Sequence, residues 1–104
     1  MLALAEKWFG LPPSASLGLN YPNPFNFSTT IPYTVGNRGP VSIRIYDVAG
    51  QLVRQLVHQE HDRGSYHAVW DGRDGVGAVV SSGMYLVRLH TEEKVETKKI
   101  MLLK

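Results

Sequence analysis

The sequence predicts an all-β fold, a sandwich of about seven antiparallel strands. From Leu17 onward, apolar and polar residues alternate in short runs, which is the period-two pattern of strands that are buried on one face. Gly, Pro, Asn and Asp separate these runs at intervals typical of a sandwich. No segment of useful length has helical periodicity. The pattern as a whole therefore favours two packed sheets.

Residues 1–16 precede this pattern, and we interpret them as a linker or lead-in. Trp8 and Phe9 belong to an apolar stretch long enough for one helical turn, and Pro12 and Pro13 follow with two serines close behind. Segments rich in Pro and Ser are typical of loops. We therefore divide the chain into a lead-in, residues 1–16, and a β-sandwich module, residues 17–104.

The first two predicted strands span residues 28–35 and 41–46. The first contains Pro32, which has no N–H to donate to a sheet, so we expect this strand to lie at an edge or to carry a bulge. The second has the cleanest alternation in the chain. It places Val41, Ile43 and Ile45 on the inward face and Ser42, Arg44 and Tyr46 on the outward face.

A tight turn over residues 47–50 is predicted to lead into a third strand, residues 52–58. Asp47 at the first position and Gly50 at the fourth suit such a turn. His58 and His61 follow, together with two acidic residues. Because a spacing of three along a strand points side chains to opposite faces, the two rings are not placed to share a metal. We interpret this segment as a solvated polar turn.

The second half of the chain continues in the same way. A strand up to Trp70 is followed by a turn-rich stretch, residues 71–77, and by a short predicted strand at Val79 and Val80. The last two strands are predicted over residues 84–91 and 94–103. His67 and His90 are expected to point outward. The residues predicted to form the core are Ile31, Ile43, Ile45, Tyr66, Trp70, Tyr85, Val87 and Leu89.

The last strand departs from the alternation, because residues 100–103 are all apolar. Both of its faces therefore require cover. We expect the chain's own loops to provide the second cover, with the lead-in, a parent domain and a docking partner as alternatives.

Composition and charge exclude several classes of function. The chain has 11 Lys and Arg residues against 9 Asp and Glu residues, and its cations are scattered along the sequence, so nucleic-acid binding is not indicated. The absence of cysteine excludes disulfides, thiol catalysis and cysteine-ligated zinc. No apolar run approaches the roughly 20 residues that span a membrane. Residues 1–10 lack the features of a signal peptide, so an export signal is expected upstream in a longer precursor.

Catalytic motifs are missing as well. Ser81 and Ser82 precede Gly83 in the wrong frame for a nucleophile elbow, and no glycine loop for phosphates is present. We therefore predict neither an enzyme nor a cofactor. Asp71 and Asp74 lie in a Gly-rich turn and are weak candidates for calcium ligands. A calcium loop uses more oxygen ligands, however, and Asp-Gly is common in ordinary turns.

The most distinctive segment spans residues 20–26 and reads Asn-Tyr-Pro-Asn-Pro-Phe-Asn. Its prolines fix their own φ and keep the preceding residues extended, and its asparagines are suited to bonding neighbouring backbone. Tyr21 and Phe25 supply apolar groups that can pin the segment to the sandwich. We predict a stiff, shaped loop.

With the residues that follow, this loop resembles the type A C-terminal sorting domain of the Bacteroidetes type IX, or Por, secretion system. It equally resembles the immunoglobulin-like domain of the flagellar hook-capping protein FlgD. The resemblance covers residues 17–104 and implies an immunoglobulin-like β-sandwich. It rests on residues 19–26, 28–33, 41–50, 52–54, 64–72, 82–85 and 98–104 and on Gly77. The Trp70-Asp71-Gly72 turn together with Gly77 is closer to the FlgD-like variant.

The resemblance implies a non-catalytic C-terminal module of a larger secreted bacterial protein, downstream of a catalytic or adhesive parent domain. Outer-membrane secretion machinery would recognise the module as a sorting and anchoring signal, and the protein would pass through the periplasm to the cell surface or the medium. The alternatives are a FlgD-like assembly domain or spacer, and a small carbohydrate-binding sandwich. The predicted partner surface consists of Tyr21, Pro22, Asn23, Pro24, Phe25, Lys98, Lys99 and Lys104.

Overall fold

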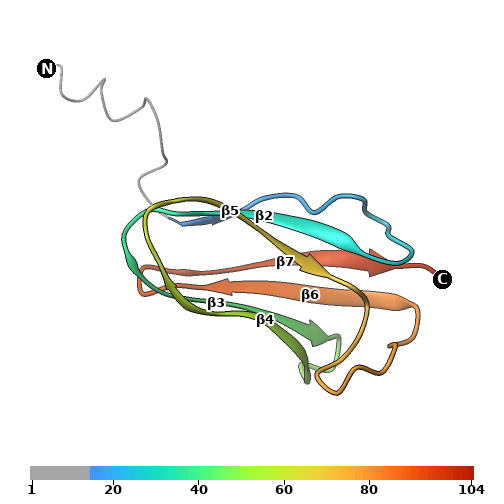
Figure 1. Ribbon diagram of the computed structural model, residues 1–104. Helices are drawn as coiled ribbons and strands as arrows, with labels where there is room; N and C mark the ends of the chain where they lie inside the picture. Colours follow the sequence, from blue (N-terminus) through green and yellow to red (C-terminus); the bar gives the residue numbers. More distant parts are fainter. Residues whose placement is uncertain (1–14) are drawn as a thin grey trace, which may run out of the picture.

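Two antiparallel β-sheets pack face to face in the computed structural model, which describes residues 15–104 (Figure 1). The described residues contain no helix, so the predicted all-β class is confirmed. The strands are β1 (Ser16–Leu17), β2 (Thr29–Val35), β3 (Gly39–Asp47), β4 (Leu52–His61), β5 (Gly64–Trp70), β6 (Gly83–His90) and β7 (Val95–Leu102).

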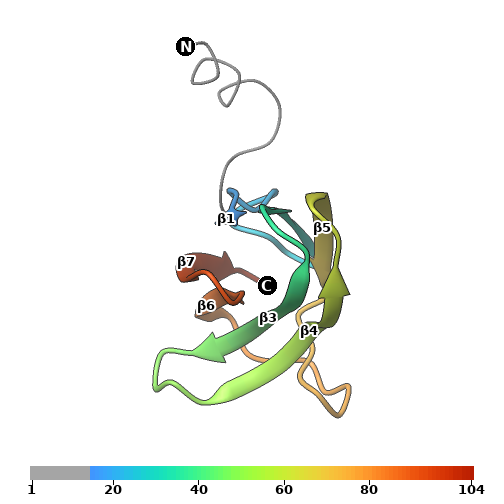
Figure 2. The ribbon, with the colours of Figure 1, turned by 90° about the vertical axis from the view of Figure 1, so that its left-hand side faces the viewer.

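The strands divide into a three-stranded sheet, in the order β1-β2-β5, and a four-stranded sheet, in the order β4-β3-β6-β7. The chain crosses between the sheets after β2, β4 and β5, whereas β3–β4 and β6–β7 are hairpins within one sheet. Figure 2 shows the two layers from one end. This arrangement is the predicted immunoglobulin-like sandwich.

The core lies between the layers and is built from alternate residues of each long strand. Trp70 is fully buried, with its ring centroid 5.5 Å from that of Phe25 and 5.2 Å from that of Tyr85. All but one of the predicted core residues are buried, and the exception, Tyr66, is half-buried. The inward and outward faces predicted for residues 41–46 are confirmed.

The prediction that Pro32 marks an edge strand or a bulge is wrong. β2 lies between β1 and β5, and its pairing with both is regular. The carbonyl of Pro32 accepts a hydrogen bond from the N–H of Gly18 (2.8 Å), so the proline nitrogen also faces the β1 side. Since β1 pairs with β2 through two residues only, the missing N–H costs the sheet no ladder bond there.

β4 continues to His61, three residues beyond its predicted end, and the interpretation of this segment as a solvated turn is wrong for His61. The side chain of His61 is buried, and its Nε2 lies 2.7 Å from the Tyr33 hydroxyl. Its ring stacks on that of Tyr66, with 4.2 Å between the ring centroids. Its Nδ1 lies 3.0 Å from the Glu60 carbonyl. Burial is tolerated because both ring nitrogens have partners. The exposed His58 points to the opposite face, as its spacing predicts.

The predicted strand at Val79 and Val80 does not form. Val79 makes one isolated bridge, to Arg73, and the loop closes on itself through a hydrogen bond from the Val80 N–H to the Gly72 carbonyl (3.0 Å). The seventh strand is β1 instead. It begins at Ser16, in the predicted lead-in, directly after the fully buried Ala15, and ends at Leu17. The remaining lead-in residues, 1–14, lie outside the described part of the chain.

Candidate interaction surface

The Pro-Asn-Pro loop, residues 20–27, is braced by its own polar groups. The Asn20 side-chain amide donates to the Thr29 hydroxyl (2.9 Å), and that hydroxyl donates to the Pro22 carbonyl (2.8 Å). Asn20 and Thr29 are both buried, so their hydrogen bonds are needed to offset desolvation. The loop therefore has the defined shape that its prolines and asparagines predict.

This loop also clamps the end of β7. The N–H of Phe25 donates to the Met101 carbonyl, and the N–H of Leu103 donates to the Phe25 carbonyl, both at 2.9 Å. The Asn23 carboxamide oxygen accepts the Met101 N–H at 3.0 Å. Phe25 itself is 2% exposed and packs on Trp70. The loop thus covers part of the edge of the last strand, although Leu103 remains half exposed.

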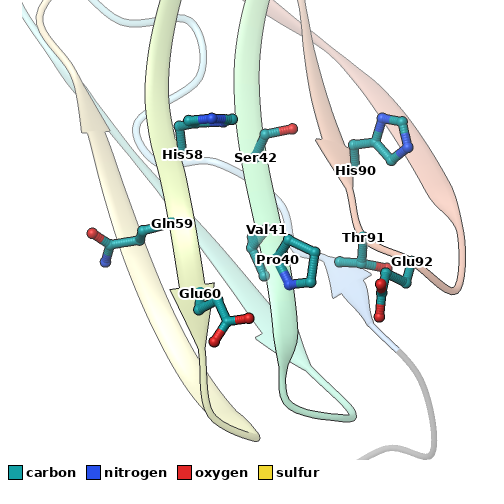
Figure 3. Close-up of a pocket in the computed structure, with 9 residues that line it drawn as sticks. All are labelled: Pro40, Val41, Ser42, His58, Gln59, Glu60, His90, Thr91 and Glu92. Carbon is teal, nitrogen blue, oxygen red and sulfur yellow. The ribbon is translucent and has the colours of Figure 1, made fainter.

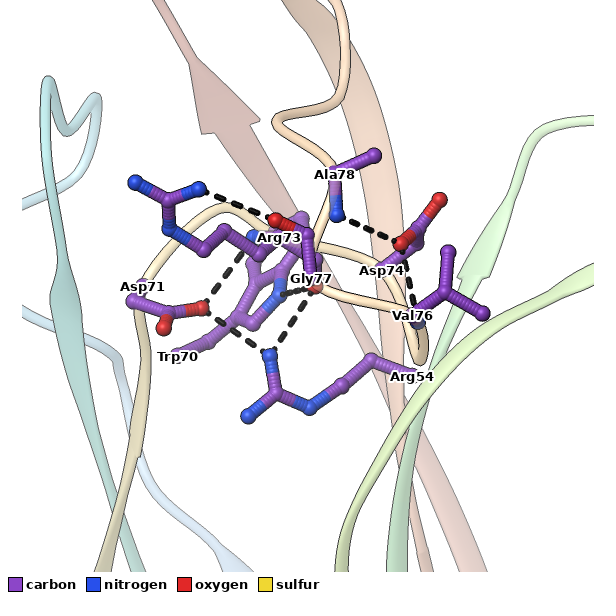
Figure 4. Close-up of polar contacts among 8 residues, drawn as sticks. All are labelled: Arg54, Trp70, Asp71, Arg73, Asp74, Val76, Gly77 and Ala78. Carbon is purple, nitrogen blue, oxygen red and sulfur yellow. Dashed lines mark hydrogen bonds and ion pairs between the residues drawn. The ribbon is translucent and has the colours of Figure 1, made fainter.

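The Trp-Asp-Gly turn forms a second braced loop, residues 71–80 (Figure 4). Asp71 Oδ1 accepts the Arg73 N–H (3.1 Å) and pairs with Arg54 (3.0 Å). Asp74 Oδ1 accepts the N–H groups of Val76 (3.0 Å) and Ala78 (2.9 Å). Both carboxylates therefore shape the loop. No group of three or more His, Asp or Glu side chains within residues 15–104 is placed to hold a metal ion; calcium binding stays a prediction from the sequence.

The two loops and Lys104 meet around one cavity of about 300 Å³. Lys104 is one of its lining residues, so the cavity lies at the end of the sandwich where the chain ends, marked C in Figure 1. The lining residues are Asn26, Phe27, Asp71, Gly72, Arg73, Val79, Leu102 and Lys104. We call this set the loop-end surface.

The structure brings only some of the predicted partner residues to the loop-end surface. The backbone N–H of Lys104 donates a hydrogen bond to the Ser82 hydroxyl (3.0 Å), and its side-chain ammonium donates to the Val80 carbonyl. These two bonds hold Lys104 at this surface. Lys98 and Lys99 lie away from it, on opposite faces of β7, with Lys98 opposite Val87 and Lys99 opposite Leu86. The three lysines thus form no common patch.

Most residues of the loop-end surface were not predicted from the sequence, among them Phe27 and Arg73. Phe27 is 83% exposed, and Arg73 donates to the Gly77 carbonyl (2.9 Å) at the rim. Phe25 and Phe27 are two apart, and in an extended chain such residues share one face. The chain bends at residues 26–27 instead, so alternation along the chain provides no signal that Phe27 is exposed.

A shallower groove of about 380 Å³ lies at the other end, on the outer face of the four-stranded sheet (Figure 3). His58, Ser42 and His90 stand side by side on β4, β3 and β6. Glu60 at its rim pairs with Arg38 (3.2 Å), and hydrogen bonding to Asp62 raises the pKa of the Arg38 guanidinium above its usual value. Among residues 15–104, no hydrogen bond joins the Ser42 hydroxyl to a histidine.

The described residues contain no helix long and apolar enough to cross a membrane. Residues 24–94 match the model of the FlgD Ig-like domain family. No curated protein matches the chain.

Several solved structures have the same fold. Dimeric latent PorU from Porphyromonas gingivalis aligns with a TM-score of 0.70 and 23% identity, over 91% of this chain and 10% of PorU. PorZ from the same organism, described as an essential surface component of the type IX secretion system, aligns with a TM-score of 0.53 and 24% identity, over 96% of this chain and 12% of PorZ. The chain thus spans about a tenth of these two proteins.

FlgD from Xanthomonas campestris, a protein of hook capping in flagellar assembly, aligns with a TM-score of 0.59 and 20% identity. The alignment covers 94% of this chain and 72% of that FlgD. At these identities, the similarities to solved structures establish the fold alone.

Proposed function

Because the chain belongs to the FlgD Ig-like domain family, we propose that it is a non-catalytic module of a larger exported bacterial protein. Its proposed role is that of a sorting and anchoring signal for type IX export to the cell surface. The observation that carries the proposal is the clamp between the Pro-Asn-Pro loop and β7. It makes the last strand and the loop one folded surface, which a secretion apparatus could recognise as a shape.

Two further observations support this proposal. The loop-end surface presents the exposed Phe27 beside Arg73 and Lys104, a combination of aromatic and cationic groups that is common in protein interfaces. PorU and PorZ contain the same fold as a small part of much longer chains, which is the arrangement expected of an appended module.

The proposal is tested by fusing residues 1–104 to the C-terminus of a periplasmic reporter in a bacterium that has the type IX machinery. We expect the reporter on the surface or in the medium, and in the periplasm of a strain that lacks the machinery. Phe27→Ala, which removes an exposed side chain without emptying the core, should reduce export. Val48→Ala, at another exposed apolar position, is the matched control. A folded fusion that stays in the periplasm of the competent strain would falsify the sorting role.

A second candidate function is that of a FlgD-like assembly domain or spacer. It is favoured by the family match and by the large share, 72%, of a FlgD chain that this fold covers. The full-length gene discriminates between the two functions. A catalytic or adhesive domain upstream supports sorting, whereas a hook-capping segment upstream supports assembly.

A further inference from the structure

The outer face of the four-stranded sheet has a charge pattern that neither proposed role explains. Residues that alternate with the core positions point outward from β3, β4, β6 and β7. Three of them are cations, Arg44, Arg88 and Lys99, which come from three adjacent strands. Although the cations look scattered in the sequence, the sheet gathers these three on one face.

None of the three cations is neutralised by a carboxylate of the described residues. Arg44 donates to the Gln55 carboxamide oxygen (2.9 Å), and Arg88 donates to the Thr97 hydroxyl (3.3 Å), both of which are neutral. The ion pairs within residues 15–104 involve Arg38 and Arg54 only. The part of the face around these three residues therefore carries a positive charge that no carboxylate pairs with, which favours association with an acidic surface.

Apolar groups lie beside these cations on the same face. Tyr46 on β3 is paired with Leu52 of β4 on one side and with Leu86 of β6 on the other, so the three side chains form one row across the sheet. The side chain of Leu52 is 56% exposed. Met84 and Met101 form the next pair along the sheet. Tyr, Met and Arg are enriched in protein interfaces.

The details of this face favour a protein over other anionic partners. The guanidinium of Arg88 lies 5.0 Å above the Tyr46 ring, so this ring has one face covered and is less suited to stack on a sugar. Three cations are also few for tracking a phosphate backbone. The exposed Leu52 and the half-buried Leu86 beside the cations gain from burial against a complementary protein surface.

We propose that this face, defined by Arg44, Tyr46, Leu86, Arg88 and Lys99, binds an acidic surface of another protein. Carboxylates of the partner pair with the three cations, and its apolar groups pack on Tyr46 and Leu86. This face shares no residue with the loop-end surface, so the test of this proposal does not depend on the export role.

The test uses a probe of the stated chemistry, the peptide acetyl-Glu-Leu-Asp-Phe-Glu-Leu-Asp-amide, titrated into the ¹⁵N-labelled chain. We expect saturable shifts of amide signals in β3, β6 and β7, with a Kd below about 1 mM, and weaker binding as salt is added. A peptide with Lys in place of each acidic residue, and one with Ser in place of each apolar residue, should bind at least about tenfold more weakly.

Arg88→Glu should weaken binding of the acidic peptide at least about tenfold. Arg63→Glu is the matched control, because Arg63 is exposed near the β4–β5 turn, outside this face, and should leave the affinity unchanged. The amide spectrum of each variant verifies its fold. The proposal is overturned by the absence of binding at millimolar peptide, by shifts that map elsewhere, or by equal affinity of the acidic and basic peptides. Binding of heparin or anionic phosphatidylglycerol vesicles at this face, without binding of the acidic peptide, also overturns it.

Discussion

Tyr33, His61 and Tyr66 form a buried polar stack between the sheets, and they show how single residues connect the two layers. The Tyr33 and Tyr66 rings stack at 5.5 Å, and the Tyr33 hydroxyl meets His61 Nε2 at 2.7 Å. Nδ1 of His61 donates to the Glu60 carbonyl, which can only accept. The Tyr33 hydroxyl and His61 Nε2 are partners as well, so both groups are satisfied.

This stack predicts a loss of stability in alkali. Burial raises the pKa of Tyr33 from 10.0 to about 12, and the adjacent Tyr66 adds to the shift. Between these two pH values the unfolded chain loses a proton that the folded chain keeps, so the free energy of unfolding falls as the pH rises. We expect a fall on the order of 2 kcal/mol from pH 10 to pH 12, measured by urea unfolding.

Tyr33→Phe separates this contribution from general alkaline denaturation. The variant should be less stable at neutral pH by about 1 kcal/mol, because His61 Nε2 loses its partner. Its stability should also fall less steeply than that of the wild type above pH 10. Parallel pH profiles for the two proteins would show that Tyr33 is not the group responsible.

At the scale of elements, the Pro-Asn-Pro loop and β7 act as one unit. Three backbone groups at the end of β7, the N–H and carbonyl of Met101 and the N–H of Leu103, find partners in the loop through Phe25 and Asn23. The strand is an edge strand of the four-stranded sheet, and unpaired edges are prone to add foreign strands. The clamp therefore both fixes the end of the chain and blunts this edge.

Asn23→Ala is expected to loosen the clamp locally. It removes the acceptor of the Met101 N–H and should cost about 1 kcal/mol. Amide hydrogen exchange at Met101 should accelerate while exchange at Ile43, in the centre of β3, changes little. Asn26→Ala, at an exposed loop position, is the control. Unchanged exchange at Met101 in Asn23→Ala would contradict the role assigned to this side chain.

At the scale of the whole molecule, the last strand belongs to the same cooperative unit as the core. Leu102 is 1% exposed and lies in the central cluster, next to the half-exposed Leu103. The module is small enough for two-state unfolding. Loss of packing at the end of the chain should therefore destabilise the sandwich as a whole.

A matched pair of substitutions measures this coupling. Leu102→Ala should lower the free energy of unfolding by about 2–5 kcal/mol, because it leaves a cavity in the core. Leu103→Ala should change it by no more than about 0.5 kcal/mol. Denaturant unfolding followed by circular dichroism checks both values, and equal effects of the two substitutions would show that the end of the chain is not part of the core.

The sequence alone determined the features that depend on local pattern. Period-two alternation places residues on one face of a strand or the other whatever the strand pairs with, so the strands and nearly the whole core were predictable. The turn at Asp47 was also predictable, since its carboxylate accepts the N–H groups of Ala49 and Gln51 within the same turn.

Only the tertiary structure decided which distant residues meet. Asn23 and Met101 are 78 positions apart, and no local pattern indicates that one caps the other. The burial of His61 depends on Tyr33 in the opposite sheet. The separation of Lys98 from Lys99 follows from alternation, but the gathering of Lys99 with Arg44 and Arg88 follows from strand order. The physical reason is that alternation is a property of one strand, whereas these sites are made by pairings between strands far apart in the chain.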